Sequence, residues 1–133
     1  MVEHHQLALW EKKLKILFDE IDDFLENKYG QEFPLQPNRP KRGATSSKNH
    51  DGLFNVGAAF SGGYGSEHGA GYVIEIRMST LAHVPDELRN TIGLEVKDLV
   101  EEKLQEQFPG KDLKVAKDGF VYKIYGDLTL GFA

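Results

Sequence analysis

Cysteine is absent from this sequence of 133 residues, and tryptophan occurs only once. Without cysteine the chain can form no disulfide, hold no zinc ion or iron–sulfur cluster on thiolates, and use no thiol nucleophile. No apolar run approaches the roughly 20 residues of a membrane span. The N-terminus also lacks the basic and then apolar pattern of a secretory signal. We therefore expect a cytoplasmic protein that does not enter a membrane.

Positive charge is also scarce. The chain has 16 Lys and Arg against 21 Asp and Glu, so its formal net charge is −5. An acidic chain repels a long polyanion, which disfavours nucleic acid as a partner. Hydrophobic residues make up 40% of the chain and charged residues 28%, which is typical of globular proteins. The length suits a single domain over residues 1–133.

An N-terminal helix over residues 3–29 is predicted by apolar residues that recur every three or four positions. They are Leu7, Trp10, Leu14, Leu17, Ile21 and Phe24. At 1.5 Å per residue such a helix is about 40 Å long, and its outer end would extend beyond a compact domain. Leu7, Leu9 and Trp10 would then need another partner. We therefore expect a homodimer formed through this helix.

The segment 31–52 is predicted to be a loop, because three of the five prolines lie in it. From Gln36 to His50 it carries four basic residues and no acidic one, so this stretch is +4 and the rest of the chain is −9 (−5 minus 4). Arginine and lysine beside hydroxyl groups can bind a phosphate or a carboxylate. The predicted anion ligands of the loop are Arg39, Lys41, Arg42 and Lys48.

A change of the hydrophobic period to two predicts a hairpin over residues 53–81. Its strands are joined by a Gly-rich connection, SGGYGSEHGAG. The connection contains neither a complete dinucleotide-binding motif nor a P-loop, so no cofactor is predicted. It nevertheless carries three functional side chains, those of Tyr64, Glu67 and His68.

A second helix is predicted over residues 85–108 and a second hairpin over 112–126. Pro85 and the acids that follow it are typical of a helix start, whereas Gly93 is unfavourable in a helix interior. The dipeptide Asp118-Gly119 is a strong turn signal for the hairpin.

These elements, in the order α-β-β-α-β-β, predict an α+β fold. The simplest arrangement is a four-stranded antiparallel sheet with both helices packed on one face. The opposite face would carry polar side chains, including Arg77, and an antiparallel sheet can leave such a face in water. Arg77 therefore joins the predicted ligand-binding residues.

Histidines supply the candidates for general acid–base catalysis, because imidazole titrates near neutral pH. They are His68, which follows Glu67, and His50, which precedes Asp51. Glu67 is itself a candidate. No H-x-H or H-x-x-x-H spacing occurs, so no metal site is predicted.

Two functions follow from the loops. The first is a binding module for an anionic small molecule or an acidic protein segment. Its predicted ligands are Arg39, Lys41, Arg42, Lys48, Tyr64, His68 and Arg77. The second is a small enzyme acting on a phosphorylated or carboxylated metabolite, with His68 as general acid or base. The absence of a complete catalytic motif favours the binding module. Both hypotheses expect the loop 31–52 to fold over the Gly-rich connection and form one shared pocket.

A third hypothesis comes from a resemblance. The predicted element order and the acidic charge resemble those of bacterial type III secretion chaperones, which are small, dimeric α+β proteins. The resemblance implies a dimeric chaperone-like domain that binds other proteins. It concerns topology and charge, and a fold alone does not determine a function.

Overall fold

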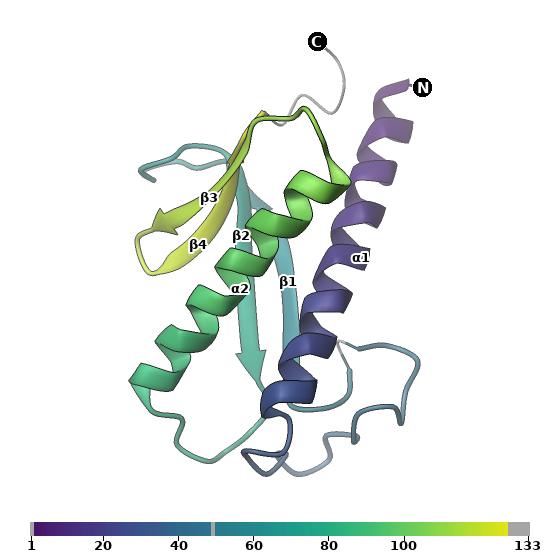
Figure 1. Cartoon of the computed structure of the whole chain (residues 1–133), viewed down its shortest axis with the longest axis vertical. Helices are drawn as coiled ribbons and strands as arrows, with labels where there is room; N and C mark the ends of the chain where they lie inside the picture. The colour runs from purple at the N-terminus through teal and green to yellow at the C-terminus, as the bar shows by residue number, and fades with distance from the viewer. Residues whose placement is uncertain (1, 49, 128–133) are drawn as a thin grey trace.

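The computed structural model describes residues 2–48 and 50–127, and the side chains of residues 8–48 and 50–127. Its elements are α1 (Val2–Tyr29), β1 (Phe54–Ser61), β2 (Gly71–Met78), α2 (Asp86–Gln107), β3 (Leu113–Asp118) and β4 (Val121–Gly126). The strands form one antiparallel sheet in the order β1-β2-β4-β3. Both helices lie on the same side of the sheet (Figure 1). The predicted α+β class and element order are confirmed.

The chain forms the sheet from two hairpins, β1–β2 and β3–β4, joined through α2. Since β4 is antiparallel to both β2 and β3, those two strands run in the same direction with β4 between them. A connection between parallel strands must cross one face of the sheet, which is why α2 lies against it. The second hairpin therefore meets β2 only through β4.

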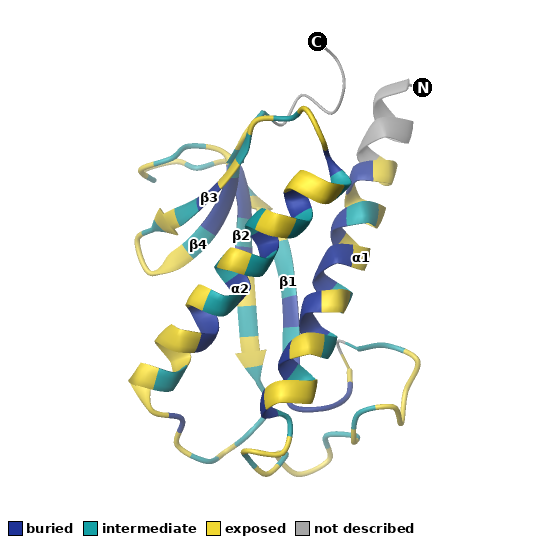
Figure 2. Ribbon diagram, in the orientation of Figure 1, coloured by how far each residue is buried: buried dark blue, intermediate teal, exposed yellow. Residues whose placement is uncertain are grey.

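The core lies between the helices and the alternate strand residues that face them (Figure 2). The buried apolar helix residues include Trp10, Leu14, Leu17, Phe18, Ile21, Leu25, Ile92, Val96, Val100 and Leu104. They meet buried strand residues such as Val56, Ile74, Val115 and Ile124. Phe24 was expected in the buried stripe but is 40% exposed. A helical repeat of 3.6 residues shifts the buried stripe away from a strict heptad pattern, so Leu25 takes the inner position.

The outer part of α1 is covered by its own domain. Trp10 is only 3% exposed, and its ring lies 5.7 Å from that of Tyr72 and 4.6 Å from that of Phe108. The expectation that Trp10 needs a second chain to cover it was therefore wrong, because α2 and the loop after it extend as far as this end of α1. Leu9 is exposed, and the side chain of Leu7 lies outside the described residues. The homodimer stays a prediction.

Gly93, unfavourable by helix propensity, is buried where α2 approaches β4. A Cβ atom at this position would lie 3.4 Å from Cε2 of Tyr122. The helix and the sheet are therefore close enough here that only a small residue fits without rearrangement.

Candidate functional site

The loop 31–52 is folded back onto α1 by its own cations. Arg42 forms ion pairs with Asp22, with Asp51 at 3.0 Å and with Glu26 at 3.7 Å. The Asp22 side chain is fully buried, so the guanidinium compensates a charge that has no access to water. Arg42 therefore has a structural partner within the fold.

Asp51 collects the hydrogen bonds that give this loop its shape. Its carboxylate accepts from the backbone N–H groups of Gly43 and Thr45 at 3.2 and 3.1 Å, and from the Thr45 hydroxyl at 2.9 Å. Burial alone would raise the pKa of Asp51, but hydrogen bonds from Thr45, Arg42 and Gly43 outweigh burial and hold that pKa below its usual value.

The remaining predicted anion ligands of the loop divide into two groups. Arg39 donates to the backbone carbonyls of Gly52 and Asp51 at 3.0 and 3.1 Å, and Lys48 pairs with Asp23. Lys41 and the catalytic candidate His50 are exposed to solvent. Binding of an external anion here stays a prediction, but such an anion would compete with the carboxylates and carbonyls that already contact Arg39, Arg42 and Lys48.

The Gly-rich connection is folded onto the second hairpin. Lys123, almost fully buried, pairs with Asp118 at 3.0 Å and donates to the Ser66 hydroxyl and the Gly69 carbonyl at 3.0 and 2.9 Å. Gly63 lies at φ +78°, and a Cβ atom there would be 2.0 Å from the Gly69 carbonyl carbon. Glycine is therefore needed for the connection to close on itself.

His68 is held by backbone and ring contacts. Its N–H donates to Asp118 at 3.1 Å, its ring stacks on Tyr125 at 4.4 Å, and its Nε2 lies 3.2 Å from the Lys117 carbonyl. Glu67 also donates its backbone N–H to Asp118. Burial raises the pKa of Asp118, but Lys123 and these two N–H groups lower it to about 2.

The two loops do not form the expected shared pocket. The loop 31–52 leads into the first residue of β1, and the Gly-rich connection follows the last one (Figure 1). A strand of eight residues is about 25 Å long. The expectation is corrected for this reason: β1 separates the cations of the loop from Tyr64, Glu67 and His68. Tyr64 itself is 99% exposed.

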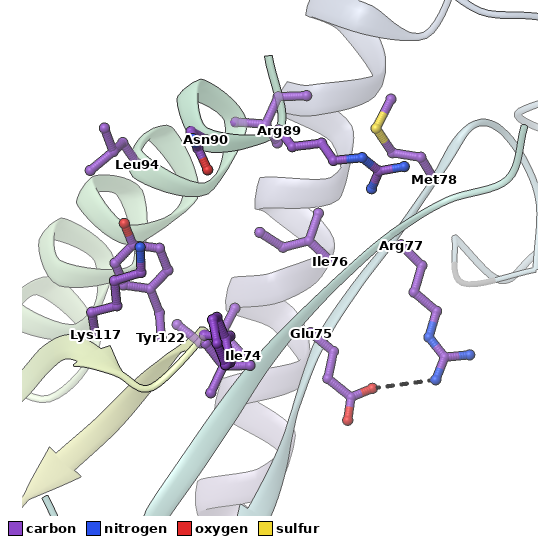
Figure 3. A pocket seen from close by; sticks show the side chains of 13 residues that line it. Ile74, Glu75, Ile76, Arg77, Met78, Arg89, Asn90, Leu94, Lys117 and Tyr122 are labelled. Carbon is purple, nitrogen blue, oxygen red and sulfur yellow. Dashed lines mark ion pairs between the residues drawn. The ribbon is translucent and has the colours of Figure 1, made fainter. Parts of the chain in front are cut away.

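A groove that the sequence did not indicate lies beside β2. β2 pairs with β1 along its whole length, but with β4 only from Tyr72 to Ile74. In the described part of the chain, no strand pairs with β2 on the β4 side beyond Ile74. The groove occupies about 600 Å³ between this half of β2, the first turns of α2 and the tip of the β3–β4 hairpin (Figure 3).

The middle of the groove is apolar, and two cations, Arg89 and Lys117, line it on the side of the sheet that α2 covers. Its lining comprises Ile74, Glu75, Ile76, Arg77, Met78, Arg89, Asn90, Ile92, Leu94, Lys117, Phe120, Val121 and Tyr122. Phe120 and Leu94 are exposed apolar side chains at its rim. Arg77 and Glu75 point to the other side of β2 from Ile76 and Met78, and pair loosely at 3.9 Å (Figure 3).

The backbone of the open half of β2 is directed into the groove. The Ser79 N–H donates to the Leu53 carbonyl, so the odd-numbered residues of this strand direct their backbone groups toward β1. Because successive residues alternate, Ile76 and Met78 direct theirs to the open side. The Met78 carbonyl accepts the Thr80 N–H. The N–H and C=O of Ile76 and the N–H of Met78 therefore face the space that a further strand would fill.

At the start of β1, carboxylates of α1 block the outer edge of the strand. Its Phe54 and Val56 N–H groups donate to carboxylates of α1, those of Glu26 at 3.3 Å and Asp22 at 3.2 Å. Glu26 also accepts from the Leu53 N–H. Side chains that occupy an edge in this way prevent another strand from adding to it. The start of the β1 edge is therefore blocked by side chains, whereas the open half of β2 lies beside a groove.

Sequence reasoning selected one groove residue, Arg77, and missed Arg89, Leu94, Lys117 and Phe120. The signal that could have indicated a groove was the difference in length between an eight-residue β2 and a six-residue β4. The register that leaves Glu75–Met78 without a partner strand on the β4 side is a tertiary property.

Among the side chains of residues 8–48 and 50–127, no three from His, Asp or Glu form a group that could hold a metal ion. Neither described helix combines the length and the apolar character needed to cross a bilayer.

Comparison with known proteins identifies relatives by sequence. A family model described as "Uncharacterised protein" matches residues 5–126. A protein of Borreliella burgdorferi, also described as uncharacterized, is 42% identical over 107 residues, which cover 80% of this chain and 84% of that protein. No solved structure matches the chain significantly.

Proposed function

Because this chain belongs to the family of uncharacterised proteins matched over residues 5–126, we propose its function from its own geometry. It is a protein-binding module that receives an extended segment of a partner protein along the open half of β2. The segment adds a strand to the sheet beyond the β3–β4 hairpin, and its side chains fill the groove under α2.

The observation that supports this proposal is the unpaired half of β2 beside a groove. Unpaired strand edges are the template for strand addition, in which main-chain hydrogen bonds provide affinity and side-chain pockets provide specificity. Here the main-chain groups of Ile76 and Met78 and the pocket between Ile76, Leu94 and Tyr122 adjoin each other. An exposed strand edge promotes aggregation unless it is blocked, as side chains of α1 block the start of β1.

The proposal keeps one part of the earlier hypotheses and weakens another. Recognition of a protein segment is common to the binding module and to the chaperone-like domain. The enzyme hypothesis required His68 and the cations of the loop 31–52 to converge, and β1 holds them apart. Among the described residues that line the groove there is no histidine, and Glu75 is the only carboxylate.

Strand addition can be tested at Ile76. Proline at this position removes the N–H that faces the groove and leaves the hydrogen bonds to β1, which come from the odd-numbered residues. Seven-residue peptides selected by phage display on the wild-type chain should bind Ile76→Pro at least tenfold more weakly, and Ile76→Val as tightly as the wild type. Amide chemical shifts on binding should change along Glu75–Met78.

Two results would contradict the proposal. One is a set of selected peptides that binds Ile76→Pro and the wild type equally. The other is a set of shift changes confined to the loop 31–52 or the Gly-rich connection. Circular dichroism must show that Ile76→Pro remains folded. If it does not, Leu94→Trp, which fills the groove from α2, replaces it with the same expected loss.

A further inference from the structure

We infer that the segment bound along β2 carries an apolar side chain with an acidic residue two positions away on each side, in the pattern acid-x-apolar-x-acid. This inference rests on the proposed function and specifies the class of partner: an acidic, extended protein segment.

The groove carries a local positive charge. On the side of the sheet that α2 covers, the described lining of the groove has two cations, Arg89 of α2 and Lys117 of β3, and no carboxylate. Glu75, the acid in the lining, lies on the opposite side of β2 (Figure 3). Among the described residues, neither Arg89 nor Lys117 takes part in an ion pair, although the chain as a whole has a formal charge of −5. Two unpaired cations on an acidic protein favour an anionic occupant.

The two cations lie at opposite ends of the groove. Lys117 is paired across the hairpin with Tyr122, and Tyr122 is paired with Ile74, so Lys117 lies at the hairpin end of the groove. Arg89 projects from the first turns of α2 toward Met78, at the other end (Figure 3). Ile76 lies between them. The order along the groove is therefore cation, apolar surface, cation.

An extended segment can place its side chains in the same order as the groove residues. Side chains on one face of a strand are two residues apart and about 6.6–6.8 Å from each other. When one apolar side chain of the segment lies opposite Ile76, its neighbour on that face lies opposite Met78, toward Arg89. Tyr122 already occupies the position opposite Ile74, so at its other end the segment leaves the sheet beside Tyr122, near Lys117. Carboxylates at those two places would pair with the cations, whereas lysines would meet like charge.

The experiment compares three peptides that differ only at the flanking positions. Fluorescein-labelled Ser-Glu-Thr-Val-Thr-Glu-Ser, its Gln form and its Lys form are titrated against the full chain by fluorescence anisotropy. The Glu peptide should bind at least fivefold more tightly than the Gln form and at least 20-fold more tightly than the Lys form. The double variant Arg89→Glu/Lys117→Glu should reverse the order of the Glu and Lys peptides.

A matched control separates local charge from net charge. Lys12→Glu changes the charge by the same sign on an exposed residue of α1, and should leave the three affinities within twofold of the wild type. Raising the salt concentration from 50 to 500 mM should weaken the Glu peptide more than the Gln peptide, because exposed ion pairs are screened.

The possible failures are distinguishable. If the Gln or Lys peptide binds the wild type as tightly as the Glu peptide and Ile76→Pro still abolishes binding, the charge pattern is wrong and strand addition stands. If no peptide binding responds to Ile76→Pro, both are wrong. If phosphatidylglycerol vesicles bind and lose that binding in the double variant while the Glu peptide does not bind, the cations serve a membrane surface and the inference is overturned.

Discussion

At the scale of one residue, Arg42 pairs with acids of its own fold, although the sequence suggested that it could bind an external anion. In the sequence it belongs to a cationic stretch with no acid nearby, whereas in the structure it contacts the acids Asp22, Glu26 and Asp51. Two of these come from a helix about 20 residues earlier. A local charge count cannot detect partners at that separation, which is why the loop 31–52 suggested an anion site.

Replacing Arg42 tests this structural role. Arg42→Ala leaves the Asp22 carboxylate buried without its cation, and removing one partner of a buried ion pair costs 3–5 kcal/mol. Since Arg42 is partly exposed, we expect a loss at the lower end, about 3 kcal/mol of the free energy of unfolding, measured by urea denaturation. Lys41→Ala, one residue away and exposed, should change it by less than about 0.5 kcal/mol. An equal, small effect of both variants would contradict the structural role.

Asp118 predicts a dependence of stability on pH. Its pKa in the folded chain is about 2, below the value of about 3.9 for an exposed aspartate. The ionised form therefore stabilises the fold; this contribution is complete above roughly pH 5 and is lost as the pH falls toward 2. Asp118→Asn removes the contribution, so the difference in free energy of unfolding between wild type and variant should be largest near pH 6 and shrink toward pH 2.

Urea denaturation at half-unit pH steps measures that difference. The matched control is Asp112→Asn, on an exposed aspartate near the start of β3, whose effect should be small and nearly constant with pH. A difference for Asp118→Asn that grows as the pH falls would show that the Lys123 pair does not stabilise the ionised form.

At the scale of the element, the sequence predicted where α2 begins but not that its Gly93 contacts Tyr122 of β4. Pro85 and the first-turn acids indicated the start of the helix within one residue. Helix propensity marked Gly93 as a weakness, but propensity contains no information about Tyr122, whose ring the helix approaches. Local patterns predict where an element lies, and the distance to its neighbour depends on side chains that are remote in sequence.

The contact at Gly93 yields a stability prediction. A Cβ atom would lie 3.4 Å from Tyr122, an ordinary contact distance, and alanine in a helix interior is more favourable than glycine by roughly 0.5–1 kcal/mol. Gly93→Ala should therefore raise the free energy of unfolding by up to about 1 kcal/mol. Gly93→Leu, which needs the space of the Tyr122 ring, should lower it by about 1–3 kcal/mol. Thermal denaturation of both variants is the measurement, and a destabilised Gly93→Ala would mean that helix and sheet are closer than this.

At the scale of the whole molecule, the predicted homodimer depends on what covers α1. Its inner face is occupied by the core, and Trp10 belongs to that core. Its exposed apolar residues, Leu9, Ile16 and Phe24, recur at helical spacing on another face. These residues now support the prediction of a dimer interface in place of Trp10.

Light scattering coupled to size exclusion tests the dimer. The wild type should have twice the chain mass of 15.0 kDa, and Ile16→Glu should reduce it to the mass of one chain. Glu20→Gln, on the same helix and exposed, is the control and should leave the mass unchanged. A wild-type protein with the mass of one chain would show the dimer prediction to be wrong.

The groove also belongs to this largest scale. Sequence periodicity indicated β2 and β4 separately, and both strands are present with nearly the predicted bounds. Their register leaves Glu75–Met78 without a partner strand on the β4 side. That register depends on how α2 spans the sheet and places the second hairpin. The cations of the groove, Arg89 and Lys117, lie 28 residues apart in the sequence, and they line the same groove only because of that placement.

The sequence by itself determined the elements, their order and the α+β class, because hydrophobic period, helix-start residues and turn signals act over a few residues. Only the tertiary structure decided which charges pair within the fold, which loops remain apart and which strand edge is open. Those properties arise from contacts between segments distant along the chain, and a local pattern does not encode the distance between two such segments. The candidate site of this protein is of that second kind.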